Sequence, residues 1–192
     1  MTKFLTITIA IASLLAAILF LRPAKKEFAP NLPVVASDPT PVPSQLTTVR
    51  SPDGKATLVM RERKEEGGTT YTFTVSSEKD PSYKEIFTKT LAEGGITIPF
   101  NTFSPDDKYI LLKENLPGGT RYFVVALANG QIFEASDLFA EKFGSDYVVS
   151  DATGWGGLNL VVINTQKVGG GSGPSFWFEV PSQAFIRLSH SF

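Results

Sequence analysis

Hydrophobic and polar positions alternate with a period of about two over most of the chain beyond residue 45. The alternating stretches are short, rich in β-branched and aromatic residues, and bounded by Gly, Pro, Asn, Asp or Ser, which is typical of strands separated by turns. The predicted strands cover residues 55–63, 69–77, 84–90, 107–114, 120–127, 131–135, 146–151, 158–165, 175–180 and 184–189. The one predicted helix, 136–143, is short, with Ser136 or Asp137 as its cap. The pattern therefore predicts an all-β, antiparallel fold.

Two similar turn sequences occur 53 positions apart. They read Ser51-Pro52-Asp53-Gly54-Lys55 and Ser104-Pro105-Asp106-Asp107-Lys108. Proline presets φ for the first central turn position, aspartate accepts backbone N–H groups, and glycine tolerates a positive φ at the end of the turn. We therefore interpret both sequences as structural turns. Asp107 stands in the glycine position and should adopt the left-handed conformation.

The turns belong to a longer repeat. A further shift of 50 places Gly154-Trp155-Gly156-Gly157-Leu158 in the same position, and each of the three segments precedes an apolar strand, a Gly-rich loop, an aromatic strand and a closing strand. The sequence thus predicts a β-repeat domain over residues 46–192. Its three units cover about 46–95, 96–145 and 146–192.

These units resemble the blades of TolB-type (WD-like) β-propellers, in which a Phe-Ser-Pro-Asp-Gly-Lys motif links the innermost strand of a blade to the second. Phe103 to Lys108 match that motif with Asp107 in place of Gly, and Ser51 to Lys55 match it with Arg50 in place of the aromatic residue. The resemblance implies antiparallel blade-like repeats. Since three blades cannot close a ring, we expect a partial propeller or one completed in a homodimer. A compact antiparallel β-sandwich is the alternative.

The N-terminal region has a different pattern. Phe4 to Leu21 contain no charged residue, and eighteen helical residues would span about 27 Å, close to the roughly 30 Å hydrocarbon core of a bilayer. No small-residue cleavage pattern ends this run. We predict a transmembrane anchor over residues 1–22, with a cleaved signal peptide or a buried helix as alternatives. Residues 23–45 are rich in proline and are predicted to be an extended linker.

Two observations favour opposite orientations of this anchor in the membrane. Arg22, Lys25 and Lys26 flank its C-terminal end against Lys3 at the other, which by the positive-inside rule favours an internal domain. A short N-terminal anchor followed by a proline-rich stalk instead favours delivery of the domain to the outside. We predict a single-pass membrane protein with an extracytoplasmic C-terminal domain.

Composition excludes several kinds of chemistry. The formal net charge of −1 predicts no attraction to nucleic acid, and the absence of cysteine rules out disulfides, thiolate catalysis and Cys-ligated zinc. The only histidine, His190, lies near the C-terminus, so a Ser-His-Asp triad or a histidine metal site is not expected. Neither 169–173 nor 154–157 has the spacing of a nucleotide-binding loop. We predict no catalytic residue, no metal site and no cofactor.

The remaining functional hypothesis is recognition. Trp155, Arg121 and Tyr122 are of types enriched at binding hot spots, and Trp155 stands in a glycine-rich segment. The sequence thus favours a membrane-anchored module that binds a protein or a glycan, and Trp155→Ala should then abolish partner capture without loss of stability. The alternative is a structural subunit of a cell-envelope complex without a soluble ligand.

Overall fold

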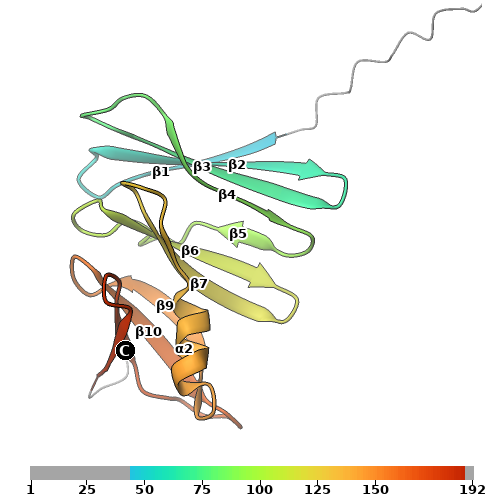
Figure 1. Ribbon diagram of the computed structural model, residues 1–192, viewed down its shortest axis with the longest axis vertical. Coiled ribbons are helices and arrows are strands. Elements are labelled where there is room, and N and C mark those ends of the chain that lie inside the picture. Colours follow the sequence, from blue (N-terminus) through green and yellow to red (C-terminus); the bar gives the residue numbers. More distant parts are fainter. Residues whose placement is uncertain (1–43, 189–192) are drawn as a thin grey trace, which may run out of the picture. The chain divides into compact units, whose positions relative to one another are not determined.

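The protein is seen in a computed structural model that describes residues 44–188 (Figure 1). Three four-stranded antiparallel sheets follow one another along the chain. Sheet A contains β1 (Ser44–Arg50), β2 (Ala56–Glu65), β3 (Gly68–Ser77) and β4 (Lys84–Leu91). Sheet B contains β5 (Gly95–Thr97), β6 (Tyr109–Leu116), β7 (Gly119–Ala126) and β8 (Ile132–Phe133), and is followed by helix α2 (Ala135–Phe143). Sheet C contains β9 (Tyr147–Trp155), β10 (Leu160–Lys167), β11 (Phe176–Glu179) and β12 (Ala184–Arg187).

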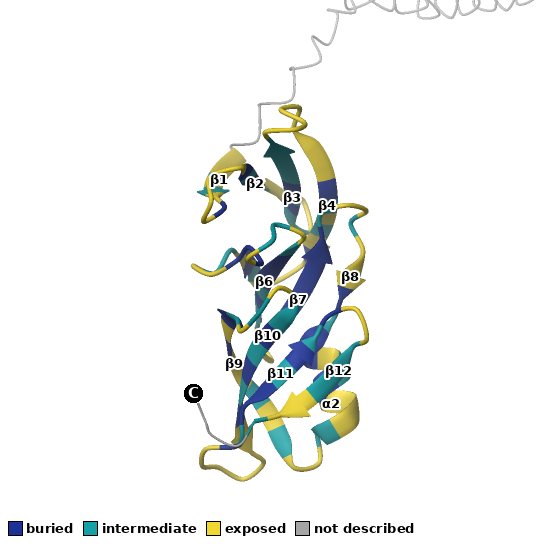
Figure 2. Cartoon of the chain, turned by 90° about the vertical axis from the view of Figure 1, so that its left-hand side faces the viewer, coloured by how far each residue is buried: buried dark blue, intermediate teal, exposed yellow. Residues whose placement is uncertain are grey.

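In each sheet the spatial order of the strands is their order in the chain. Figure 2 shows the three sheets one above another, with β1 and β9 along one side and β4, β8 and β12 along the other. This is a blade-like arrangement, and the prediction of an all-β, antiparallel fold is confirmed. The three sheets do not close into a ring within residues 44–188.

Sheet B is the central layer and is buried on both faces. In β6, Ile110 and Leu112 pack toward sheet A in one apolar cluster, whereas Leu111 between them packs toward sheet C in a second cluster. In β7, Phe123 and Tyr122 divide in the same way. A strand buried on both faces needs apolar residues at consecutive positions, which explains the unbroken runs of these two strands.

The flanking sheets A and C bury one face each. In β3, Tyr71 and Phe73 are buried against sheet B, while the threonines between and beside them lie on the opposite face. In β11, Phe176 is buried and Trp177 is only partly covered, as the alternation of these two residues predicts. The outer face of sheet A is thus rich in Thr, which a β-sheet exposed on one side readily accommodates.

The structure corrects three details of the sequence interpretation. Sheets A and B each contain one strand that was not predicted, β1 and β5. Strand β1 is mostly exposed and lacks an apolar alternation, and β5 has only three residues. Strand β9 extends to Trp155, so this residue ends a strand instead of lying in a turn. Helix α2 has Glu134 at its N-cap position without a side-chain cap; the Ser136 hydroxyl instead accepts a hydrogen bond from the Tyr122 N–H, at 2.8 Å.

The predicted anchor (1–22), all but the last two residues of the predicted linker (23–45) and His190 lie outside the described residues. Within residues 44–188, no helix has the length and apolar character needed to cross a bilayer.

Candidate functional site

The first Ser-Pro-Asp turn joins β1 to β2 and is closed by its own side chains. The Asp53 carboxylate accepts hydrogen bonds from the Ser51 hydroxyl at 2.8 Å, the Lys55 N–H at 2.9 Å and the Lys55 ammonium at 2.7 Å. The Ser51 hydroxyl in turn accepts the Ala56 N–H at 2.9 Å. Gly54 has φ of 76°, which glycine adopts at no steric cost. The motif therefore specifies this turn largely through contacts within a few residues.

The second turn, before β6, repeats this network. The Ser104 hydroxyl donates to Asp106 at 2.9 Å and accepts the Tyr109 N–H at 3.0 Å, and the Lys108 ammonium bonds Asp106 at 2.8 Å. Asp107 occupies the glycine position with φ of 54°. A non-glycine residue in this conformation carries backbone strain of about 1 kcal/mol or more, although aspartate tolerates it better than most residues.

Asp107 brings the two turns together. Its carboxyl group lies close enough to Asp53, in the turn of the neighbouring sheet, to affect the pKa of that residue, and both acids line one cleft. Burial, followed by the hydrogen bond and charge of Asp53, raises the pKa of Asp107 above its usual range. Hydrogen bonds from Lys55 and Ser51 hold the pKa of Asp53 well below its usual range. The two acids thus differ in proton affinity, with Asp107 the one that retains a proton more readily.

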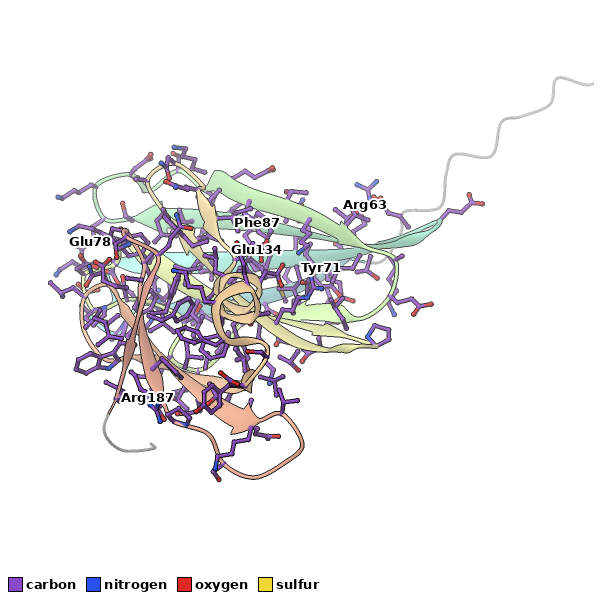
Figure 3. All side chains as sticks on the ribbon, turned by 60° about the horizontal axis from the view of Figure 1, so that its bottom comes forward. Arg63, Tyr71, Glu78, Phe87, Glu134 and Arg187 are labelled. Carbon is purple, nitrogen blue, oxygen red and sulfur yellow. The ribbon has the colours of Figure 1, made fainter. Side chains whose placement is uncertain are left out.

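A cleft of about 860 Å³ opens beside this acid pair, between sheets A and B. Its walls are the two Ser-Pro-Asp turns, the loop between β3 and β4, and the loop between β7 and β8. Glu78, labelled in Figure 3, belongs to the first of these loops. Tyr109 and Phe133 also line the cleft. We call this feature the turn cleft; its volume is in the range of small-molecule and peptide pockets.

Two residues predicted to contact a partner, Arg121 and Tyr122, are neighbours in β7 and therefore lie on opposite faces of sheet B. Tyr122 is 1% exposed, and its hydroxyl donates to the Asp151 carboxylate of sheet C at 2.7 Å. Burial, followed by this hydrogen bond, raises the pKa of Tyr122. Arg121 is exposed and lies 3.6 Å from Asp137 at the start of α2. Neither residue lines the turn cleft, and the burial of Tyr122 places it in the core between sheets B and C.

Trp155 lies between sheets B and C. Its indole N–H donates to the Thr102 carbonyl at 3.1 Å, and its ring stacks on Tyr109 with centroids 6.2 Å apart. Tyr109 is also in edge contact with Phe133, which lines the turn cleft. The structure therefore places Trp155 behind the cleft as a packing residue, and does not bring it together with Arg121.

One charged pair was not found by the sequence analysis. Glu114 of β6 is 2% exposed, and its carboxylate accepts a hydrogen bond from the Lys89 ammonium of β4 at 2.7 Å. The charges of Lys89 and Glu114 both affect Glu134, which is labelled in Figure 3. Burial and Glu114 raise the pKa of Glu134, whereas Lys89 lowers it. In the sequence, Glu114 lies near the end of an apolar strand and cannot be distinguished from an ordinary exposed polar residue. Its partner is 25 positions away, so only the packing of sheet A on sheet B identifies it.

Residues 44–188 contain no group of three or more His, Asp or Glu side chains arranged to hold a metal ion. The acid pair of the turn cleft has two carboxylates from adjacent turns, and the nearby Lys55 and Lys108 ammonium groups already bond Asp53 and Asp106.

Asp107→Gly should stabilise the fold. Glycine relieves the left-handed strain, which outweighs its greater freedom in the unfolded chain, and also removes a half-buried acid near Asp53. We expect the free energy of unfolding to rise by about 1 kcal/mol at pH 7, measured by urea denaturation.

The pH dependence separates the two causes of this gain. Because the folded-state pKa of Asp107 is raised, its contribution to stability is greatest at low pH and is lost as the pH rises through that pKa. The gain from Asp107→Gly should therefore be larger at pH 7 than at pH 3. Asp107→Asn keeps a side chain that tolerates positive φ but removes the ionisable group. It should therefore show only the pH-dependent part of the gain in the free energy of unfolding. A loss of stability in Asp107→Gly would show that the carboxyl group is net stabilising.

Comparison with models of known protein families finds no match, and no curated protein is significantly similar to the chain.

Proposed function

We propose that the β-domain is a binding module whose ligand occupies the turn cleft, and that this ligand is a segment of another protein presenting a lysine or arginine side chain. The observation that carries this proposal is the cleft itself. It lies where two sheets meet, it has about 860 Å³ of space, and its wall includes Asp53 and Asp107, two acids from the turns of adjacent sheets. Concave sites with a few convergent polar groups are the usual location of a ligand.

The charges of the cleft favour a cationic group. Asp53 and Asp106 each bond a lysine of their own turn, at 2.7 and 2.8 Å. Asp107 has no salt bridge among the described residues and feels Lys55 only at longer range. An ammonium or guanidinium group of a ligand would relieve the repulsion between Asp107 and Asp53, which supports an ionised pair in the bound state.

The aromatic residues of the cleft favour a protein over a glycan. Sugars usually require a free aromatic face, whereas Tyr109 already stacks on Trp155 and contacts the edge of Phe133. The cleft wall is otherwise made of loops with exposed polar groups, such as Asn129 and Gln131. These groups can bond the backbone of an extended peptide.

The wider setting is also part of the proposal. We propose that the domain is a partial propeller of TolB-like blades, held at the outer surface of a membrane by the apolar segment of residues 4–21, and that it has no catalytic activity. The Ser-Pro-Asp turns and the apolar N-terminal run support this interpretation. A homodimer that completes the ring remains one form the partial propeller can take.

The cleft is tested by selecting peptides from a random display library with the full-length chain in a mild detergent, beside a glycan array. We expect the selected peptides to contain Lys or Arg and to bind roughly tenfold more weakly to Asp107→Gly. Since this variant should be more stable than the parent, unfolding would not explain the loss. Asp137→Asn, an exposed acid outside the cleft, is the matched control and should bind normally. Selected peptides that ignore Asp107→Gly, or binding of glycans alone, would overturn the proposal.

One observation favours a structural subunit as a second candidate. The side of sheet C that faces away from sheet B exposes Val148 and Ile186, and Trp177 of β11 lies in register between Val162 and Ile186. An apolar face of this kind is typical of surfaces covered in an assembly. A structural subunit should co-purify with its neighbour in a fixed stoichiometry that Asp107→Gly leaves unchanged.

A further inference from the structure

The sheet edges of this domain are protected in different ways. An exposed edge strand offers unpaired N–H and C=O groups to other chains, and proteins limit this with short strands, charges or bulges. Strands β5, β8 and β12 have three, two and four residues. Strand β4 carries Lys84, Glu85 and Lys89. Strand β9 has two register shifts against β10. Five of the six described edges are therefore short, charged or irregular.

Strand β1 has none of these features. It pairs with β2 over seven consecutive residues without a register shift, from Ser44 opposite Arg63 to Arg50 opposite Thr57. Its sequence, SQLTTVR, has a single charge at its last residue and no proline. Leu46 is 58% exposed. A long and regular edge with few charges is the form to which another strand adds most readily.

The pairing shows which backbone groups face outward. The Ser51 N–H donates to the Ala56 carbonyl at 2.9 Å, so this is a hydrogen-bonded pair of the ladder. Bonded and non-bonded pairs alternate in an antiparallel ladder. The N–H and C=O groups of residues 44, 46, 48 and 50 therefore point away from β2. Four donors and four acceptors line the free edge.

The charges beside this edge identify the kind of strand that fits. Arg50, Arg61 and Arg63 lie on the same side of sheet A, since they occupy alternate positions in register, and Arg63 is labelled in Figure 3. On that side Arg63 bonds Glu65 at 3.2 Å, and Arg50 and Arg61 have no salt bridge among the described residues. A second copy added antiparallel would bring its own Arg50 beside Ser44 and toward Arg63, which like charges disfavour. An acidic strand complements the surface.

We propose that β1 is a docking edge, to which an extended acidic segment of another protein adds as a fifth strand of sheet A. Alternate acidic side chains of that segment lie on the side of Arg50 and Arg61, and its backbone bonds the outward groups of Leu46 and Thr48. This site is separate from the turn cleft and prefers ligands of the opposite charge. The two proposals can therefore fail independently.

The probe is a fluorescent seven-residue peptide of alternating Glu and Val. A peptide of alternating Lys and Val is the comparison. Binding of each peptide to the full-length chain in mild detergent is measured by fluorescence anisotropy. We expect the Glu peptide to bind at least tenfold more tightly, with an affinity that falls as salt is added. Peptide binding should also slow amide hydrogen exchange of Leu46 and Thr48 in β1. Asp107→Gly should leave this binding unchanged.

The matched variants are Thr48→Pro and Thr48→Val. Proline removes an outward N–H at a position where an edge strand tolerates it, and valine keeps that N–H, so the first should weaken binding about tenfold and the second should not. Should urea denaturation show that Thr48→Pro unfolds, a Glu and Val peptide N-methylated at alternate residues replaces it and should fail to bind. Equal binding of the two peptides, or equal binding by the two variants, would overturn the proposal. Concentration-dependent dimerisation through β1 without peptide binding would also overturn it, because a second copy would then be the occupant.

Discussion

Lys89→Ala should lower the free energy of unfolding by about 3 kcal/mol. The substitution leaves the Glu114 carboxylate, which is 2% exposed, without the ammonium group that bonds it at 2.7 Å. Breaking a buried ion pair from one side typically costs 3–5 kcal/mol, and the lower end applies because Lys89 is itself 29% exposed. Urea denaturation at neutral pH measures the change.

The controls for this prediction distinguish the pair from the loss of a surface charge. Lys64→Ala, at the exposed end of β2, should change stability by less than about 0.5 kcal/mol. The double variant Lys89→Met, Glu114→Leu replaces both charges by apolar side chains and should recover most of the loss, since such pairs are often replaceable without net cost. A cost of Lys89→Ala below about 1 kcal/mol would mean that Glu114 gains water or another partner when Lys89 is removed.

Trp155→Ala is the second substitution with a large expected effect, and we expect a loss of about 3 kcal/mol. It removes an indole that stacks on Tyr109 and a hydrogen bond to the Thr102 carbonyl, both in the contact between sheets B and C. The sequence alone led us to expect this substitution to spare stability. The structure gives it a different expected result, because the side chain packs within the domain. Thermal or urea denaturation measures it.

Trp177→Ala is the matched control for Trp155. Trp177 points away from the core cluster that contains its neighbours Phe176 and Phe178, so its truncation should cost about 1 kcal/mol or less. Equal losses for both tryptophans would show that the outer face of sheet C is covered in solution, as a structural subunit requires. A loss for Trp155→Phe nearly as large as that for Trp155→Ala would assign most of the effect to the Thr102 hydrogen bond.

Asp107 at the turn cleft provides a test of whether ligand binding and stability oppose each other in this protein. Asp107 departs from the Phe-Ser-Pro-Asp-Gly-Lys motif and adopts a φ of 54° that glycine would adopt without strain. Strained residues often mark binding sites, because selection retains them for a contact that stability alone would not favour. A variant that gains stability and loses a ligand would show this directly.

Local sequence determined the turns and most of the strands of this protein. The Ser-Pro-Asp turns could be predicted because the groups that satisfy them, such as Ser51 and Asp53, lie within five residues of one another. The alternation in β3 and β11 and the continuous apolar runs in β6 and β7 follow from whether one or both faces of a sheet are buried. The repeat of about fifty residues likewise predicted a succession of similar antiparallel units.

Tertiary structure alone decided which residues of these elements come together. The shared cleft of Asp107 and Asp53 and the bond of Lys89 to Glu114 bring together residues of different sheets, and no sequence pattern records such a pairing. Strand β1 was not predicted, because it is mostly exposed and its sequence has no periodic apolar pattern. Its strand conformation depends on pairing with β2. From the sequence, Trp155 and Tyr122 could be interpreted as surface contacts, but the packing of sheet C on sheet B buries Tyr122 and partly buries Trp155. A strand's residue types are fixed by the sequence, but whether each face meets water or another sheet depends on how the sheets stack.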